Sequence, residues 1–189
     1  MSTKQEGVIS KAKEKLKREV LDIENRTDIS NDEKATRIIK VFATTCAAVA
    51  VQPIPFADIF VLTPLQAYMG TRIAAIRGVP ISKVNAITII KEIAGVVGFG
   101  MLGQNFVLTA YKIGVPFAGG FMTIPLVYAA SYAIGKTMDF YFIKKSRNES
   151  FNPEELKKVW KETLKKKKAE GKENRKDIWK SRDDYEPEN

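Results

Sequence analysis

The sequence predicts an all-α protein, and three observations support this prediction. Apolar residues recur at intervals of three and four near both ends of the chain, as they do along one face of a helix. Capping residues precede several of these runs. No stretch shows the alternation of a β-strand. We expect a helical bundle built around a Gly/Ala-rich hydrophobic helical hairpin, with charged helical arms at both ends.

The composition narrows the class of function. The 189 residues carry a net charge of +9, with one Cys and no His. Histidine-dependent catalytic triads and His/Cys metal clusters are therefore excluded, and we expect neither an enzyme nor a cofactor or bound metal. A basic balance suits an anionic membrane surface or a nucleic acid. No apolar segment follows the first Met, so we expect no secretory signal.

Charge divides the chain into three parts. We expect a charged N-terminal helical arm over residues 1–37, an apolar helical domain over 38–143, and a basic C-terminal helix with a disordered tail over 144–189. In the first arm, Leu16 and Val20 belong to one helical stripe.

The order of capping residues and helix breakers places the central helices. Ser30 opens a capping box for a helix that two close prolines end near residue 52. Thr63, followed by a proline, is the expected cap of the next helix, which should end at Gly78. Ser82 then caps a long helix that reaches about Lys112.

Two uncharged runs, 93–111 and 113–135, form the core of the expected hairpin over 84–143. Helices of these lengths match the ~30 Å hydrocarbon layer. Basic flanks on one side and only Lys112 at the tip favour an inner-membrane hairpin with both termini cytoplasmic. The alternative is a cytoplasmic protein that buries the hairpin inside a soluble bundle.

Small residues in this hairpin predict close helix packing, because they let two helices approach. A P-loop-like pattern over 130–137 lies inside an apolar run, so we do not expect it to bind nucleotide. Asp58 is expected to cap a helix, and Cys46 to be a small core residue. The predicted packing positions are Gly95, Gly98, Gly100, Gly103, Ala129, Ala133 and Gly135.

The C-terminal arm starts with a capping box, in which Asn152 is the cap and Glu155 the reciprocal acceptor. Its narrow apolar stripe needs a surface, and an anionic lipid surface suits the flanking lysines. The residues expected to touch lipid are Trp160, Lys157, Lys158, Lys161 and Lys165.

A set of short motifs resembles a known family. Residues 53–58 read Pro-Ile-Pro-Phe-Ala-Asp, residues 62–69 read Leu-Thr-Pro-Leu-Gln-Ala-Tyr-Met, and similar stretches follow at 73–78 and 132–135. Over about residues 36–143 the chain resembles the bacterial domain-of-unknown-function 697 family, the YcjF-type domain. The motif residues are Pro53, Pro55, Asp58, Thr63, Gln66, Met69 and Gly78.

The resemblance implies a membrane-associated domain that works with a separately encoded GTPase, and it carries over no catalytic residue. We expect a non-enzymatic anchor, scaffold or membrane-remodelling protein. The expected partners are the lipid bilayer and that GTPase, with a homo-oligomer left open and no specific nucleic acid or small-molecule substrate. The alternatives are a soluble all-α interaction module with a buried hairpin, and a pore-forming or membrane-inserting protein.

Overall fold

The computed structural model describes residues 3–52, 61–97, 116–150 and 152–186. These residues form helices and connecting turns, with no strand among them, so the all-α prediction is confirmed. The helices are α1 (Thr3–Asn25), α2 (Asn31–Ala50), α3 (Thr63–Ile76), α4 (Lys83–Val97), α6 (Pro116–Ser146), α7 (Pro153–Glu173) and α8 (Arg175–Lys180), followed by the 3-10 helix η2 (Ser181–Tyr185).

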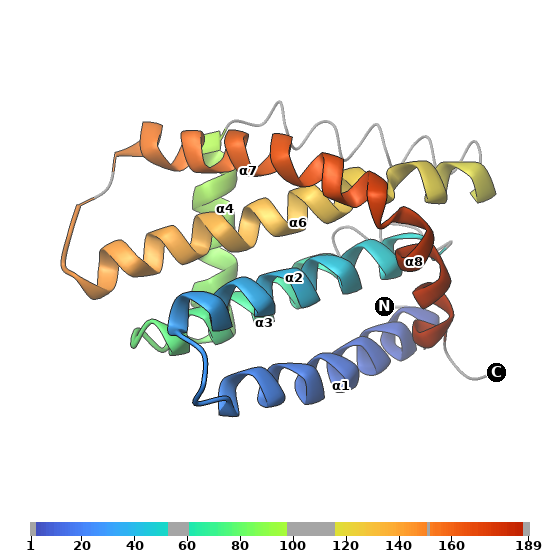
Figure 1. Ribbon diagram of the computed structural model, residues 1–189, viewed down its shortest axis with the longest axis horizontal. Coiled ribbons are helices and arrows are strands. Elements are labelled where there is room, and N and C mark those ends of the chain that lie inside the picture. Colours follow the sequence, from blue (N-terminus) through green and yellow to red (C-terminus); the bar gives the residue numbers. More distant parts are fainter. Residues whose placement is uncertain (1–2, 53–60, 98–115, 151, 187–189) are drawn as a thin grey trace.

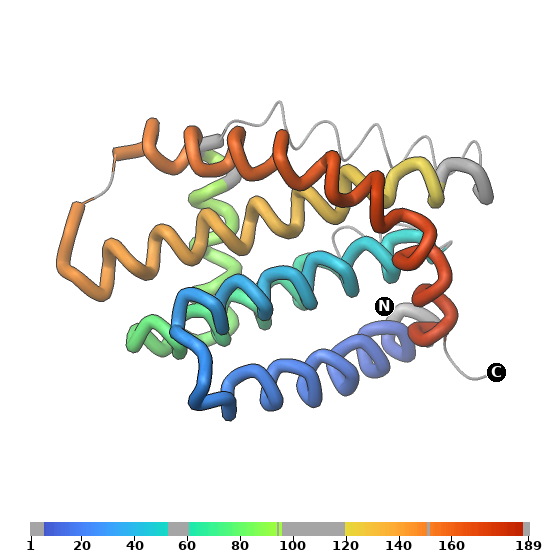
Figure 2. The backbone as a smooth tube through the Cα atoms, in the orientation of Figure 1, coloured from blue at the N-terminus to red at the C-terminus, as the bar shows by residue number. Residues whose placement is uncertain are grey.

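Helices α1, α2, α6 and α7 lie side by side in a row (Figure 1). Helix α3 packs on both α2 and α6, and α4 crosses the row at a steep angle. At the far end α8 and η2 turn down toward α1, so the C-terminal segment returns to the N-terminal one (Figure 2). Both charged arms are therefore built into the bundle.

Local sequence signals set most helix boundaries. The Oγ atoms of Ser30 and Ser82 accept hydrogen bonds from the backbone three residues on, as the caps of α2 and α4 were expected to do. Gly78 has a φ of 73° and ends α3 in the left-handed conformation that favours glycine. Thr63 differs from expectation: it is the first residue of α3, and Leu62 precedes it without a side-chain cap.

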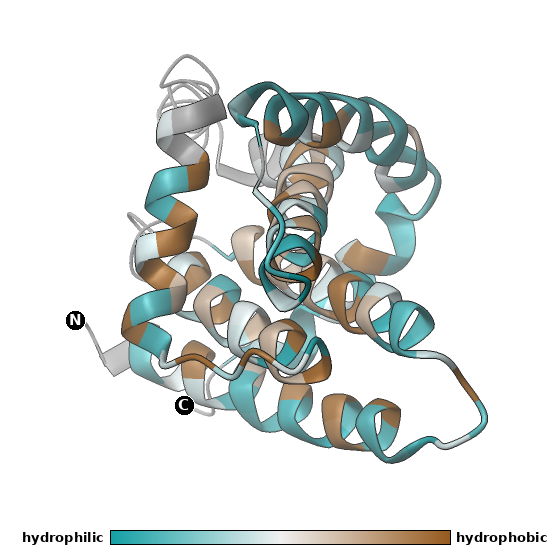
Figure 3. Ribbon diagram, turned by 90° about the vertical axis from the view of Figure 1, so that its left-hand side faces the viewer, coloured by the Kyte–Doolittle hydropathy of each residue, from teal (hydrophilic) through white to brown (hydrophobic). Residues whose placement is uncertain are grey.

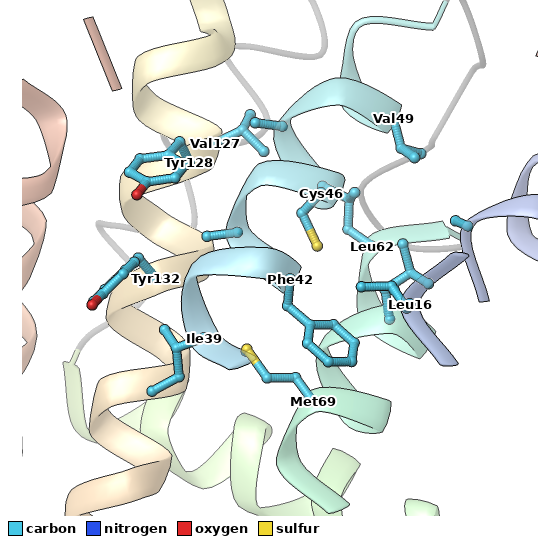
Figure 4. Packing of buried hydrophobic residues seen from close by; sticks show 14 of the residues in the cluster. Leu16, Ile39, Phe42, Cys46, Val49, Leu62, Met69, Val127, Tyr128 and Tyr132 are labelled. Atoms are coloured by element: carbon cyan, nitrogen blue, oxygen red, sulfur yellow. The ribbon is translucent and has the colours of Figure 1, made fainter. Parts of the chain in front are cut away.

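The core gathers around α2 and α6 (Figure 4). Leu16 of α1, Phe42 and Cys46 of α2 and Met69 of α3 are all fully buried. Cys46 is thus a core residue, as expected, and burial raises the pKa of its thiol to about 12. Helix α6 buries side chains on all sides, because α2, α3 and α7 together surround it.

The expected transmembrane hairpin is not supported. The hairpin's first helix, α4, ends at Val97 in the described part, and its second, α6, begins at Pro116; the residues between lie outside the described ranges. Within those ranges, no helix combines the length and the apolar character needed to cross a bilayer.

The tail also differs from the expectation. It was expected to be disordered after Gly171, but α7 continues to Glu173 and the chain then forms α8 and η2. Ile178 and Tyr185 of this segment are buried. The Tyr185 hydroxyl lies 3.2 Å from Thr45 Oγ1 of α2, and the Lys15 ammonium of α1 lies 2.7 Å from Asp184. These contacts join the two ends of the chain, and no local sequence pattern announces them.

Candidate functional site

The outer face of α7 carries a row of lysines. Lys158, Lys161, Lys165, Lys168 and Lys172 follow one another at steps of three and four, and all five are exposed. Such steps place residues on one face of a helix, and we call this set the lysine row. Glu155, Glu162 and Glu173 recur at steps of seven and eleven, which puts them on a neighbouring line. The row is therefore a continuous positive edge, and Figure 3 shows the hydrophilic α7 along the top of the bundle.

The inner face of α7 packs on the bundle. Leu156 and Trp160 are buried, and Asn152 and Glu155 form the expected capping box. Trp160 was expected to reach the lipid surface, but the structure places it in the hydrophobic core instead. Lys157 is half-buried and pairs with Glu154 at 2.6 Å. The remaining three predicted lipid-surface residues belong to the lysine row.

A very close approach fixes the end of α7 on α6. Gly171 is buried, and a Cβ atom added to it would lie 2.9 Å from the Cα and 3.1 Å from the carbonyl oxygen of Pro125. Glycine suits this position, since the two nearest atoms belong to the backbone of Pro125 and cannot move aside as a side chain would. The contact presses the last turns of α7 against the first turns of α6.

Next to this contact lies an open groove, which we call the cationic groove. Its floor is apolar and comes from α6, where the Met122 side chain is 61% exposed. Its rim is basic and comes from α7 and α8. The lining residues are Met122, Pro125, Leu126, Lys168, Lys172 and Arg175, so no acidic residue is among them.

Arg175 is the most constrained cation of the groove. Its guanidinium carbon lies 4.2 Å from the centre of the Phe121 ring, and Nη1 lies 3.7 Å from the Met122 sulfur. Its Nε is buried, and none of the described residues accepts a hydrogen bond from it. A buried N–H of an arginine is normally satisfied, so this unpaired donor sets Arg175 apart from the other cations of the groove.

Two charged clusters hold α6 in place. Asp139 is 1% exposed and accepts hydrogen bonds from Arg77 Nε at 2.7 Å and Lys136 Nζ at 3.0 Å. Arg77 also reaches Asp32 at 2.6 Å, so α2, α3 and α6 are joined. The arrangement leaves the Asp139 carboxylate no free face, and we assign it a structural role.

The second cluster joins α6 to α7. The Tyr128 hydroxyl donates to Glu170 at 2.6 Å, and the Lys167 ammonium lies 2.5 Å from the same carboxylate and 4.1 Å from the Tyr132 ring centre. Burial raises the pKa of the Tyr128 hydroxyl above its usual range. Burial alone would raise the pKa of Glu170, but the hydrogen bonds from Lys167 and Tyr128 outweigh it and hold that pKa below its usual range.

The family-motif residues are structural where they are described. Thr63 begins α3, Gln66 Nε2 donates to Ser131 Oγ of α6 at 3.3 Å, and Met69 is fully buried. Gly78 ends α3. Pro53, Pro55 and Asp58 lie outside the described residues.

The small-residue positions divide into three groups. Ala129 and Ala133 are buried, and a Cβ on Gly135 would lie 2.9 Å from two side-chain carbons of Ile39. Gly95 is exposed, and among the described residues no atom lies within 4 Å of where its Cβ would be. The other predicted packing positions, Gly98, Gly100 and Gly103, lie outside the described ranges.

Among the described residues, no group of three His, Cys, Asp or Glu side chains could bind a metal ion. The P-loop-like stretch 130–137 lies within the continuous helix α6. Met122, Gly171 and Arg175 were not predicted from the sequence. No local pattern links these three residues, whereas the lysine row could have been found from its helical spacing.

A family model described as a domain of unknown function (DUF697) matches residues 15–169. The match includes the C-terminal half of α1 and most of α7, beyond the stretch of about 36–143 that the motifs indicated. No curated protein and no solved structure matches the chain.

Proposed function

We propose a membrane role for this chain, which belongs to the family described as a domain of unknown function (DUF697). In this proposal it is a non-enzymatic helical protein that docks on an anionic membrane surface. The observation that carries the proposal is the positive face of α7, which ends beside the exposed apolar side chain of Met122. The protein lies on the membrane through this face and acts there as an anchor or scaffold. Its proposed location is the cytoplasmic side of the inner membrane.

The expected binding free energy favours such docking. Each basic side chain near an anionic lipid surface gains about 1 kcal/mol, so the five lysines of the row together supply about 5 kcal/mol at most. Met122 adds an apolar contact of the kind that interfacial proteins bury at the headgroup boundary. A nucleic acid would use the lysines but not the apolar floor, and this difference favours a membrane.

The partner proposed for this anchor is a separately encoded GTPase. The support is the family resemblance of the sequence, which implies such a partner. Purification of the tagged full chain from its native cells should recover a GTPase in a fixed ratio. Recovery of no GTPase under conditions that keep the bundle folded would remove this part of the proposal and leave the membrane part standing.

Vesicle sedimentation tests the membrane part. The full chain should pellet with vesicles of phosphatidylglycerol and phosphatidylcholine and stay in the supernatant with phosphatidylcholine alone. The triple variant Lys158→Gln, Lys161→Gln, Lys165→Gln should bind about 100-fold more weakly, since three lysines contribute about 3 kcal/mol. The matched control is Lys13→Gln, Lys17→Gln, Arg18→Gln on α1, at the opposite side of the row of helices (Figure 1).

The control variant removes the same charge and should bind within about threefold of the parent protein. Equal loss in both variants would mean that net charge alone drives binding. Tighter binding to single-stranded DNA than to anionic vesicles, lost in the same α7 variant, would assign the lysine row to nucleic acid and reject the membrane proposal.

A further inference from the structure

We propose that the cationic groove is a binding site for one anionic phospholipid, which places its phosphate among Lys168, Lys172 and Arg175 and the start of its acyl chains on Met122, Pro125 and Leu126. This inference rests on the proposed membrane docking and adds a defined site to it. It differs from general attraction along the lysine row because it requires a saturable pocket for a single molecule.

The charge arrangement selects an anion. Three cations surround the groove, and no carboxylate lines it. Glu170, an acid of α7 close in sequence to these lysines, is already engaged by Lys167 and Tyr128. Within the described part of the chain, no ion pair joins Lys168 or Lys172 to an acid. The groove therefore holds positive charge that the protein itself does not neutralise.

Arg175 supplies the fixed donor of this site. The ring of Phe121 and the Met122 sulfur hold its guanidinium, and its buried Nε has no acceptor among the described residues. A planar guanidinium donates two parallel hydrogen bonds to a phosphate, a geometry that a lysine ammonium lacks. The held guanidinium is thus prepared for a phosphate group, whereas Lys168 and Lys172 are exposed and can adjust to it.

The apolar floor selects a lipid over a free phosphate. Met122 is 61% exposed on one side of the cations, and Leu126 is half-buried beside it. The Gly171–Pro125 contact brings α7 down onto α6, so that cations from α7 and apolar side chains from α6 meet along one line. An amphiphile that carries a phosphate at one end and hydrocarbon at the other satisfies both halves of this groove.

Binding of a monomeric short-chain lipid tests the site. Dihexanoyl phosphatidic acid, kept below its micelle concentration, should bind the full chain in a saturable 1:1 calorimetric titration. In a protein labelled at its methionine methyl groups, the Met122 resonance should shift during the same titration. Dihexanoyl phosphatidylcholine should not bind, and glycerol 3-phosphate, which lacks the chains, should bind at least tenfold more weakly.

Matched variants locate the site. Arg175→Gln should weaken binding of the short-chain lipid about tenfold or more, because a charge-assisted pair of hydrogen bonds is lost. Lys176→Gln removes the same charge from the next residue, which is exposed and outside the groove, and should stay within about twofold. Lys172→Gln, at an exposed position, serves if Arg175→Gln disturbs the fold, and it should weaken binding about fivefold.

The outcomes separate this inference from the proposed function. Vesicle binding without saturable binding of the short-chain lipid would overturn the groove and leave membrane docking intact. Saturable binding of the short-chain lipid without vesicle binding would support the groove and overturn membrane docking. Equal losses in Arg175→Gln and Lys176→Gln would reduce the site to net charge, and glycerol 3-phosphate as tight as the lipid would make it a phosphate site with no lipid specificity.

Discussion

At the scale of single residues, sequence reasoning succeeded where the cause is local. Ser30, Ser82 and Asn152 cap helices as expected, because a cap depends only on the next three residues. Asp139 shows the opposite case. Its partner Arg77 lies sixty-two positions away, and only the packing of α3 on α6 brings the two charges to 2.7 Å. Nothing in the residues around either one indicates the pair.

Gly171 gives the residue-scale prediction. Gly171→Ala places a methyl group against the Pro125 backbone, which cannot move aside as a side chain would, so we expect a loss of about 1–3 kcal/mol in the free energy of unfolding. Gly95→Ala is the control: no described atom blocks its Cβ, and the better helix former should add about 0.5–1 kcal/mol. Urea denaturation of both variants measures the contrast, and equal signs would show that the α7–α6 contact is not close.

At the scale of elements, α7 combines two faces with different roles. Its cap, its first residue and its apolar stripe were predicted from the sequence, but the surface on which the stripe packs was not. The stripe of Leu156 and Trp160 faces the bundle, which leaves the polar face with the lysine row for an outside partner. Sequence periodicity identifies an apolar stripe and cannot say whether protein or lipid covers it. The same limit explains why α8 and η2 were expected to be disordered: their buried residues Ile178 and Tyr185 are too few to form a stripe.

The Glu170 cluster gives a pH prediction for this element. The pKa of Glu170 is lowered in the folded protein, so its contribution to stability is present above the unfolded-state pKa of about 4.3 and is lost as the pH falls through the folded-state value. Glu170→Gln should therefore cost about 1–2 kcal/mol at pH 7 and progressively less below pH 4. The exposed Glu173→Gln controls for charge on the same helix. A difference between parent and Glu170→Gln that does not change from pH 7 to pH 3 would contradict the role of the carboxylate.

At the scale of the whole molecule, the all-α class was predictable from the sequence. The closure of the bundle, in which the C-terminal segment packs on α1 and α2, was not predictable. The helices follow from periodicity, caps and breakers along short windows. The closure depends on pairs such as Lys15 with Asp184 and Thr45 with Tyr185, which join opposite ends of the chain. In the closed form the long, mainly apolar helix α6 is covered by α2, α3 and α7, and its exposed apolar surface is restricted to places such as Met122.

This closed form leads to a prediction about how the protein is held on a membrane. Docking through exposed lysines is electrostatic, so raising the salt concentration from 0.1 M to 1 M shortens the screening length from about 10 Å to about 3 Å and should release the protein from anionic vesicles. Alkaline carbonate should release it too, because lysine ammonium groups lose their charge near pH 11. Flotation of the full chain after each wash measures both effects. A protein that stays with the lipid after both treatments would have inserted part of its chain, and the closed bundle would then be the form that precedes insertion.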